Sequence, residues 1–226
     1  MAPSLDTVGI ITRNVRDNLI MLCAILGSDY QAFLNELRLD LPGIKIGVDF
    51  NHLGSKDITE EVRKTFLESL ELFEALGAQV VSIELPDLDT IAKVANTIIN
   101  YEGWQELKTF YEAQKENLGI GLQKKLELAS QVSQIDYQDA ILAAQTYAEQ
   151  LTQVFHRSEE TYVDVILSVG REAPAQTMAD LYENPTGARS TCNRLYSITG
   201  HPAITLPMGF SANGMPLALQ LSLIHI

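Results

Sequence analysis

Apolar and polar positions follow two different periods in the first third of the chain. Residues 60–75 place apolar side chains every three or four positions, which is the period of a helix that buries one face. The flanking runs 43–50 and 79–85 are short, rich in Ile and Val, and bounded by Gly, Asn or Pro, as strands are. Strand, helix and strand at these lengths predict a βαβ unit, with parallel strands joined by a right-handed crossover.

The helical period recurs elsewhere in the chain. It predicts a helix over 12–27, with Thr12 as its N-cap and Gly27 as its stop, and places Cys23 in the core. Residues 135–137 are interpreted as a turn and cap between two further helices. The remaining predicted helices cover residues 88–113, 118–132, 137–155 and 187–198.

The second half of the chain also contains strand patterns. Residues 163–169 are rich in Val and Ile and predict a buried strand. Residues 203–207 and 217–221 predict paired strands, with a hairpin turn at 211–214 that carries the Asn-Gly signal. Residues 170–184 are expected to be rich in loops. The whole predicts one α/β domain with a mixed, largely parallel sheet flanked by helices.

Composition narrows the choice of partners. With 16 basic and 29 acidic residues the net charge is −13, which disfavours binding to nucleic acid or to an anionic membrane. No run of 18 apolar residues and no signal peptide is visible. Cys23 and Cys192 are the two cysteines, and so few are typical of a reducing compartment, so we expect a cytoplasmic protein.

Local motifs for catalysis are weak. Gly54-Ser55-Lys56 has the residue types of a hydrolase, but adjacent side chains in an extended loop point apart, which favours a polar turn after a strand. No two of the four histidines have a metal-ligand spacing, so no metal is expected. His201 could line a pocket, although a structural histidine is the favoured interpretation.

Asp6 and Arg13 form the most informative charged pair. One interpretation is that both are solvated surface residues. The favoured alternative is a mutual ion pair, or a set of backbone hydrogen bonds, that holds the N-terminal turn in place. In that case the two residues support a site structurally and do not transfer protons.

The segment from Ser4 to Gly9, followed by Thr12-Arg13, resembles the "SLDTxGPxxR" motif of the amidase signature family. Ile10 departs from it, because the family usually has Pro there, and Ser197 replaces a common Asn. The other family motifs follow in order. They are "LxGxxIGV" at 41–48, "LxxLGAxVVxxxLPD" at 72–87, "DxxxA" at 136–140, "DVLLxP" at 164–168 and "TGxPAIxLPxGF…GxPxxLQL" at 199–221.

The resemblance implies a mixed sheet flanked by helices and the hydrolysis of a carboxamide C–N bond to a carboxylate and ammonia or an amine. In this family a Ser–cis-Ser–Lys triad does the chemistry, with no cofactor, on a small-molecule amide. The triad's "GGSSGGS" loop and its Lys have no match here, so we assign no catalytic residue. Residues 1–220 are expected to be the C-terminal portion of a single, incomplete amidase domain that is inactive alone.

Other interpretations remain open. The A subunit of a tRNA-dependent amidotransferase has an acidic residue where this chain has Ser190, and commonly Gln where it has Thr7, so a general amidase is favoured. A non-catalytic binding module with the same fold is possible, as is an unrelated doubly wound ligand-binding domain around residues 44–85. Residues 221–226 depart from the family pattern and match a translated sequencing adapter, so we expect a non-native tail.

Overall fold

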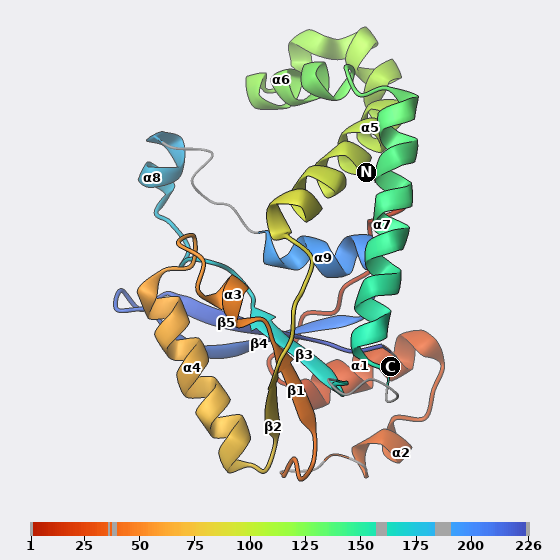
Figure 1. Cartoon of the computed structure of the whole chain (residues 1–226). Helices are drawn as coiled ribbons and strands as arrows, with labels where there is room; N and C mark the ends of the chain where they lie inside the picture. Colours follow the sequence, from red (N-terminus) through yellow and green to blue (C-terminus); the bar gives the residue numbers. More distant parts are fainter. Residues whose placement is uncertain (1, 36, 38–39, 157–161, 184–190, 225–226) are drawn as a thin grey trace.

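A five-stranded mixed sheet lies at the centre of the molecule. The computed structural model describes residues 2–35, 37, 40–156, 162–183 and 191–224 (Figure 1). The strand order is β2-β1-β3-β5-β4. The strands are β1 (Lys45–Val48), β2 (Gln79–Ser82), β3 (Val165–Val169), β4 (Ala203–Phe210) and β5 (Pro216–Ser222).

Strand directions confirm the expected mixed, largely parallel sheet. β1 pairs in parallel with β2, from Lys45↔Gln79 to Val48↔Ser82, and also with β3. β5 pairs antiparallel with both β3 and β4, so it is the one strand of this sheet that runs against the others. The predicted βαβ unit is confirmed, because the helix between β1 and β2 lies where the sequence places it.

Helices cover both faces of the sheet. They are α1 (Val15–Leu26), α2 (Tyr30–Leu34), α3 (Phe50–Leu53), α4 (Glu60–Ala75), α5 (Leu88–Gln114), α6 (Ile120–Ala129), α7 (Gln134–Val154), α8 (Met178–Glu183) and α9 (Cys192–Thr199), with a 3₁₀ turn at Lys115–Asn117. Because neighbouring residues of a strand face opposite sides, Leu167 packs with Phe66 of α4, whereas Ile166 packs with Ile91 of α5 and Leu151 of α7.

The helix ends correct two expectations. α1 begins two residues later than predicted, because the Asn14 side chain, and not that of Thr12, accepts the hydrogen bond of the first turn, from Asp17 N. Gly27 closes α1 in the left-handed conformation with φ 67°, and Cys23 is buried, as expected. α7 is capped by Ser133, so residues 135–137, expected as a turn, lie inside its first turn.

Three short helices were not predicted. α2 and α3 have five and four residues, and α8 has six residues within the segment expected to be loop. β4 continues past Pro207, because a bulge between Pro207 and Gly209 lets the strand pass the proline. The hairpin turn is confirmed, with Gly214 at φ 76°. Residues 187–190 of the predicted helix 187–198 lie outside the described residues.

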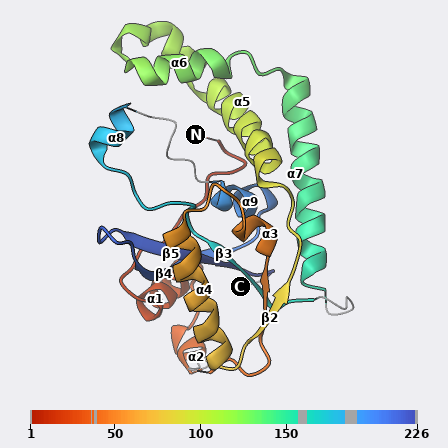
Figure 2. The same cartoon turned by 60° about the vertical axis from the view of Figure 1, so that its left-hand side comes forward.

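The long helices α5 and α7 extend beyond the sheet, and α6 lies at their far end in both views (Figures 1 and 2). Tyr101 and Tyr137 stack between the two helices with ring centroids 4.3 Å apart. None of the described helices has the length and apolar character that crossing a bilayer needs.

The expected non-native tail partly falls within the sheet. Leu221 pairs with Ile204 and Leu167, and the buried Ser222 donates a 2.9 Å hydrogen bond from Oγ to Pro202 O. Residues 223 and 224 pack at the edge of the core, and 225–226 lie outside the described residues. A foreign segment could form the same backbone pairing as a native one. The non-native origin of 221–226 therefore stays a prediction.

Candidate functional site

Four ionisable side chains lie together beyond the carboxyl ends of β1 and β3. Asp49 follows β1 directly, His52 is on α3, Glu172 follows β3, and Cys192 is the first residue of α9. We call these four residues the edge cluster. The carboxyl ends of parallel strands are where open α/β sheets commonly bind ligands.

Asp49 fixes the backbone at this edge. Its Oδ1 accepts a 2.9 Å hydrogen bond from His52 N, which caps α3, and its Oδ2 accepts a 2.8 Å bond from Leu85 N beyond β2. One carboxylate therefore ties the segments that follow two neighbouring strands, and it places His52 at their junction.

Glu172 fixes the start of α9. It is 4% exposed, and its Oε1 accepts hydrogen bonds from Thr191 N at 2.7 Å, from Thr191 Oγ1, and from Cys192 N at 3.2 Å. Burial alone would raise the pKa of Glu172, but the hydrogen bonds from Thr191 and Cys192 outweigh it and hold the pKa below its ordinary value. Glu172 is therefore a charged carboxylate at neutral pH, and it caps a helix whose own N-cap side chain makes no such bond.

Cys192 connects Glu172 to His52. Its Sγ donates to Glu172 Oε1 at 3.2 Å and lies 3.4 Å from His52 Nε2. Burial, and next the charge of Glu172, raise the pKa of the Cys192 thiol far above its ordinary value. Burial also lowers the pKa of His52 and outweighs the opposing charges of Asp49, Glu172 and Asp57. A protonated thiol is a poor nucleophile, so this arrangement forms hydrogen bonds and does not attack carbonyl groups.

A small cavity adjoins the edge cluster. Its volume is about 10 Å³, which is room for one group the size of a water molecule. Its polar lining comes from Asp49, His52 and Ser168, and the remaining lining is apolar: Val48, Leu53, Ile58, Phe66, Leu85, Leu167 and Val169. The cavity can accept one small polar group beside the imidazole.

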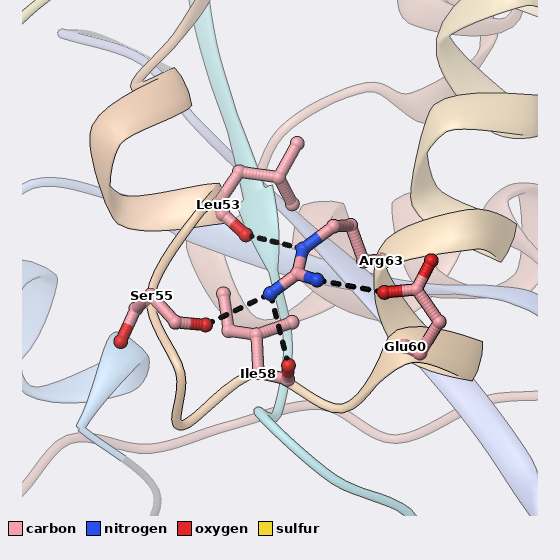
Figure 3. A network of polar contacts seen from close by, with 5 residues as sticks. All are labelled: Leu53, Ser55, Ile58, Glu60 and Arg63. Carbon is pink, nitrogen blue, oxygen red and sulfur yellow. Dashed lines mark hydrogen bonds and ion pairs between the residues drawn. The ribbon is translucent and has the colours of Figure 1, made fainter.

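Arg63 of α4 holds the loop that follows α3. Its guanidinium donates to the carbonyl oxygens of Leu53 at 2.9 Å, Ser55 at 2.9 Å and Ile58 at 3.2 Å, and it pairs with Glu60 at 2.7 Å (Figure 3). These bonds fix the carboxyl end of the four-residue helix that carries His52. The position of His52 thus depends on both Asp49 and Arg63.

Gly54-Ser55-Lys56 lies in this same loop and forms a polar turn, as expected. Gly54 N donates to Phe50 O at 2.9 Å, and Ser55 Oγ accepts from Asp57 N at 3.3 Å. The turn comes after β1, as the sequence predicted, with the short helix α3 between them.

His201 has the contacts of a structural histidine. Its Nε2 lies 3.4 Å from Thr152 Oγ1, and its ring stacks on Phe155 with centroids 5.9 Å apart. Across the part of the chain that the structure describes, no three His, Cys, Asp or Glu side chains are arranged to hold a metal ion.

Asp6 and Arg13 do not pair in the described residues. Asp6 Oδ2 accepts a 2.9 Å bond from Ala2 N, and Asp6 N donates to Ala2 O at 2.8 Å, so Asp6 closes the N-terminal turn by itself. Arg13 is exposed, and the ion pairs among described residues are formed by Arg63, Lys64 and Lys115. That Asp6 and Arg13 brace a site stays a prediction.

The edge cluster was not predicted from the sequence. Of its members, the sequence singled out only Cys192, as a cysteine without metal spacing, and His52, as one of four such histidines. Glu172 and Cys192 meet across 20 positions, most of which the sequence predicted to be loop. The one available signal was the place of Asp49 near the end of the predicted strand 43–50 and of Glu172 three positions after the predicted strand 163–169.

Comparisons with known proteins agree with the motif order. The family model described as Amidase matches residues 1–222. The A subunit of glutamyl-tRNA(Gln) amidotransferase from Halalkalibacterium halodurans is 29% identical over 252 aligned positions, which take in 97% of this chain and 51% of that protein. Its counterpart from Brevibacillus brevis is 26% identical with the same coverage. The chain thus spans about half the length of the curated relatives it matches.

Solved structures share the fold. The crystal structure of an amidase superposes with a TM-score of 0.82 at 22% identity, covering 99% of this chain and 50% of that one. The A subunit of glutamyl-tRNA(Gln) amidotransferase from Thermotoga maritima superposes with a TM-score of 0.63 at 22% identity, covering 84% of this chain and 40% of that one. The family match over nearly the whole sequence, with the motifs in family order, shows that the chain belongs to the amidase signature family.

Proposed function

We propose that this chain is the C-terminal half of an amidase domain, and that the whole protein hydrolyses a carboxamide C–N bond to a carboxylate and ammonia or an amine. The observation that carries this proposal is the family match over residues 1–222 in a chain about half as long as its curated relatives. The family resemblance implies a small-molecule amide as the substrate, and the net charge of −13 disfavours nucleic acid and anionic membranes as partners.

In this proposal the chain supplies a framework and no nucleophile. The protonated Cys192 and the neutral His52 supply no activated nucleophile, and the serine of Gly54-Ser55-Lys56 lies in a turn held by Arg63. The Ser–Ser–Lys triad would come from a segment that precedes the opening motif. The chain alone is therefore expected to be inactive. The family resemblance implies that no metal or organic cofactor is used, and the small number of cysteines favours a cytoplasmic protein.

A second candidate is the A subunit of an amidotransferase. The favouring observation is that the Halalkalibacterium and Brevibacillus relatives carry that name. Two positions argue against this candidate. Thr7 stands where that subunit commonly has Gln, and Ser190, which lies outside the described residues, stands where it has an acidic residue. The two candidates differ in their need of partners: a general amidase hydrolyses a simple amide by itself, whereas a component of an amidotransferase works within a complex on glutamyl-tRNA.

The decisive experiment is to sequence the DNA on both sides of the coding region and express the longest open frame. We expect a frame that extends upstream into a Gly/Ser-rich loop, whose product releases ammonia from a simple amide and loses that activity when the loop serine is changed to Ala. The present chain is the matched control and should release none. A stop codon directly before Met1, with a ribosome-binding site, would instead favour the non-catalytic module.

A further inference from the structure

The second half of helix α1 is apolar on every side. Residues 19–26 are eight consecutive apolar residues, which make more than two helical turns. A helix without a polar face is normally buried all round. Here Cys23 is the one buried residue of α1, and Ile25 and Leu26 are 57% and 64% exposed. The two core clusters of the described residues take no side chain from α1 or α2. α1 therefore has the composition of a core helix but lacks a cover on its outer side.

The segment that leads into α1 is exposed and apolar as well. Ile11 is 98% exposed, and Val8 nearly as much. Large exposed apolar surfaces are rare on proteins that work alone, and they mark places where another piece of protein packs. We call the exposed apolar side chains of this N-terminal segment the open face. They are Val8, Ile11, Val15, Met21, Ile25 and Leu26.

The outer edge of strand β4 is open too. Among the described strands β4 pairs with β5 alone, so the backbone groups of its other side point away from the sheet. Edge strands are commonly protected by charged residues, and β4 has none. Pro207 and the bulge after it interrupt only its second half, which leaves residues 203–206 able to pair with a further strand. α1 lies beside β4 in both views (Figures 1 and 2), so the open face and this edge are neighbours.

We propose that the open face and the outer edge of β4 form the surface on which the N-terminal half of the parent domain packs, and that this half adds a strand beside β4. The inference rests on the proposed function, which places such a half before the opening motif. The amount of protein fits, because this chain covers 51% of a curated relative and 50% of a solved amidase. The open face also lies within the first 26 residues, next to the point where that half would join. A second copy of the chain is disfavoured as the cover, since each copy carries a net charge of −13.

The test is cysteine labelling with N-ethylmaleimide under native conditions, in the present chain and in the product of the longest open frame. Ile25→Cys and Leu26→Cys should react at least about tenfold more slowly in the longer product. Leu128→Cys on α6 is the matched control, because Leu128 and Leu26 are both 64% exposed, and it should react equally fast in both. The buried Cys23 and Cys192 should stay unlabelled, which reports that each product is folded. Backbone amides of residues 203–206 should exchange hydrogen more slowly in the longer product.

Three results would overturn the proposal. The first is labelling of Ile25→Cys and Leu26→Cys in the longer product as fast as that of Leu128→Cys. The second is slow labelling already in the present chain, with a sedimentation mass of two chains, because a second copy would then cover the open face. The third is the absence of any longer open frame. Unchanged hydrogen exchange at 203–206 would refute the added strand. A longer product that protects both cysteines and releases no ammonia from a simple amide would refute the proposed function and leave the packing surface standing.

Discussion

Ser4 and Glu102, 98 positions apart in the chain, are joined by two hydrogen bonds. Ser4 N donates to Oε2 at 3.0 Å, and Ser4 Oγ donates to Oε1 at 2.6 Å. Tyr137 OH of α7 donates to the same Oε1 at 2.8 Å, and Glu102 is 8% exposed on α5. The serine of the opening motif thus holds the N-terminal turn on the two long helices, which is the kind of support that the sequence predicted for Asp6 and Arg13.

Replacing Glu102 should loosen this attachment. Glu102→Ala leaves the Ser4 N–H, the Ser4 hydroxyl and the Tyr137 hydroxyl without their acceptor, and we expect a loss of about 2–4 kcal/mol in the free energy of unfolding. Glu102→Gln keeps an acceptor oxygen and should cost about 1–2 kcal/mol. Urea unfolding followed by circular dichroism measures both.

Glu106 is the matched control, because it lies one turn further along α5 and is exposed. Glu106→Ala should stay within about 0.5 kcal/mol of the unaltered chain. An equal loss in Glu102→Ala and Glu106→Ala would show that the Ser4 attachment adds nothing to stability.

Periodicity predicted the parts of the fold that are long and regular. β1, α4 and β2 appear where the alternation and the three-to-four spacing place them, because their apolar side chains pack into the core clusters on the two faces of the sheet. α3 escaped prediction because four residues are too few for a period, and it forms since Asp49 caps it and Arg63 binds its carboxyl end. The extension of β4 past Pro207 depends on a bulge that no local pattern announces.

The sequence predicted the family and almost none of the edge cluster. The family motifs are short contiguous segments that occur in a fixed order, so they can be recognised in the sequence without a structure. Contacts such as Glu172 with Cys192 require the chain to turn back on itself between β3 and α9, and only packing decides that. Ser4 with Glu102 is the same case over a longer separation.

Arg63 should stabilise the fold mainly through its hydrogen bonds to carbonyl oxygens and only slightly through its ion pair. Arg63→Ala leaves the carbonyls of Leu53, Ser55 and Ile58 without their donor, and we expect a loss of about 2–3 kcal/mol in urea unfolding. Glu60→Ala removes the ion pair alone, and because the Glu60 side chain is 82% exposed, the loss should be below about 0.5 kcal/mol. Similar losses in both variants would contradict this division.

Two glycines should respond to alanine in opposite directions. Gly77 has φ 99°, and a Cβ there would meet Pro42 Cα at 3.3 Å, so Gly77→Ala should cost about 1–3 kcal/mol. Gly121 lies in α6 with open space around it, so Gly121→Ala should add about 0.5–1 kcal/mol by restricting the unfolded chain. Melting temperatures should therefore fall for the first variant and rise for the second, and a shift of the same sign in both would be incompatible with these backbone arguments.

The lowered pKa of His52 should make stability depend on pH. Burial lowers it, against the charges of Asp49, Glu172 and Asp57, so between the folded pKa and the ordinary value of 6.5 the unfolded chain binds more protons than the folded one. The stabilisation is fully present above pH 6.5 and is lost as pH falls through the folded pKa.

In urea unfolding between about pH 5 and 7, the difference in stability between the unaltered chain and His52→Gln should therefore shrink as pH falls. His156→Gln is the matched control, because His156 is exposed. The carboxylate of Glu172 acts in a lower window, because its pKa lies below the ordinary 4.5, so it does not mask the effect. A pH-independent difference for His52→Gln would mean that the imidazole is not held neutral in the folded chain.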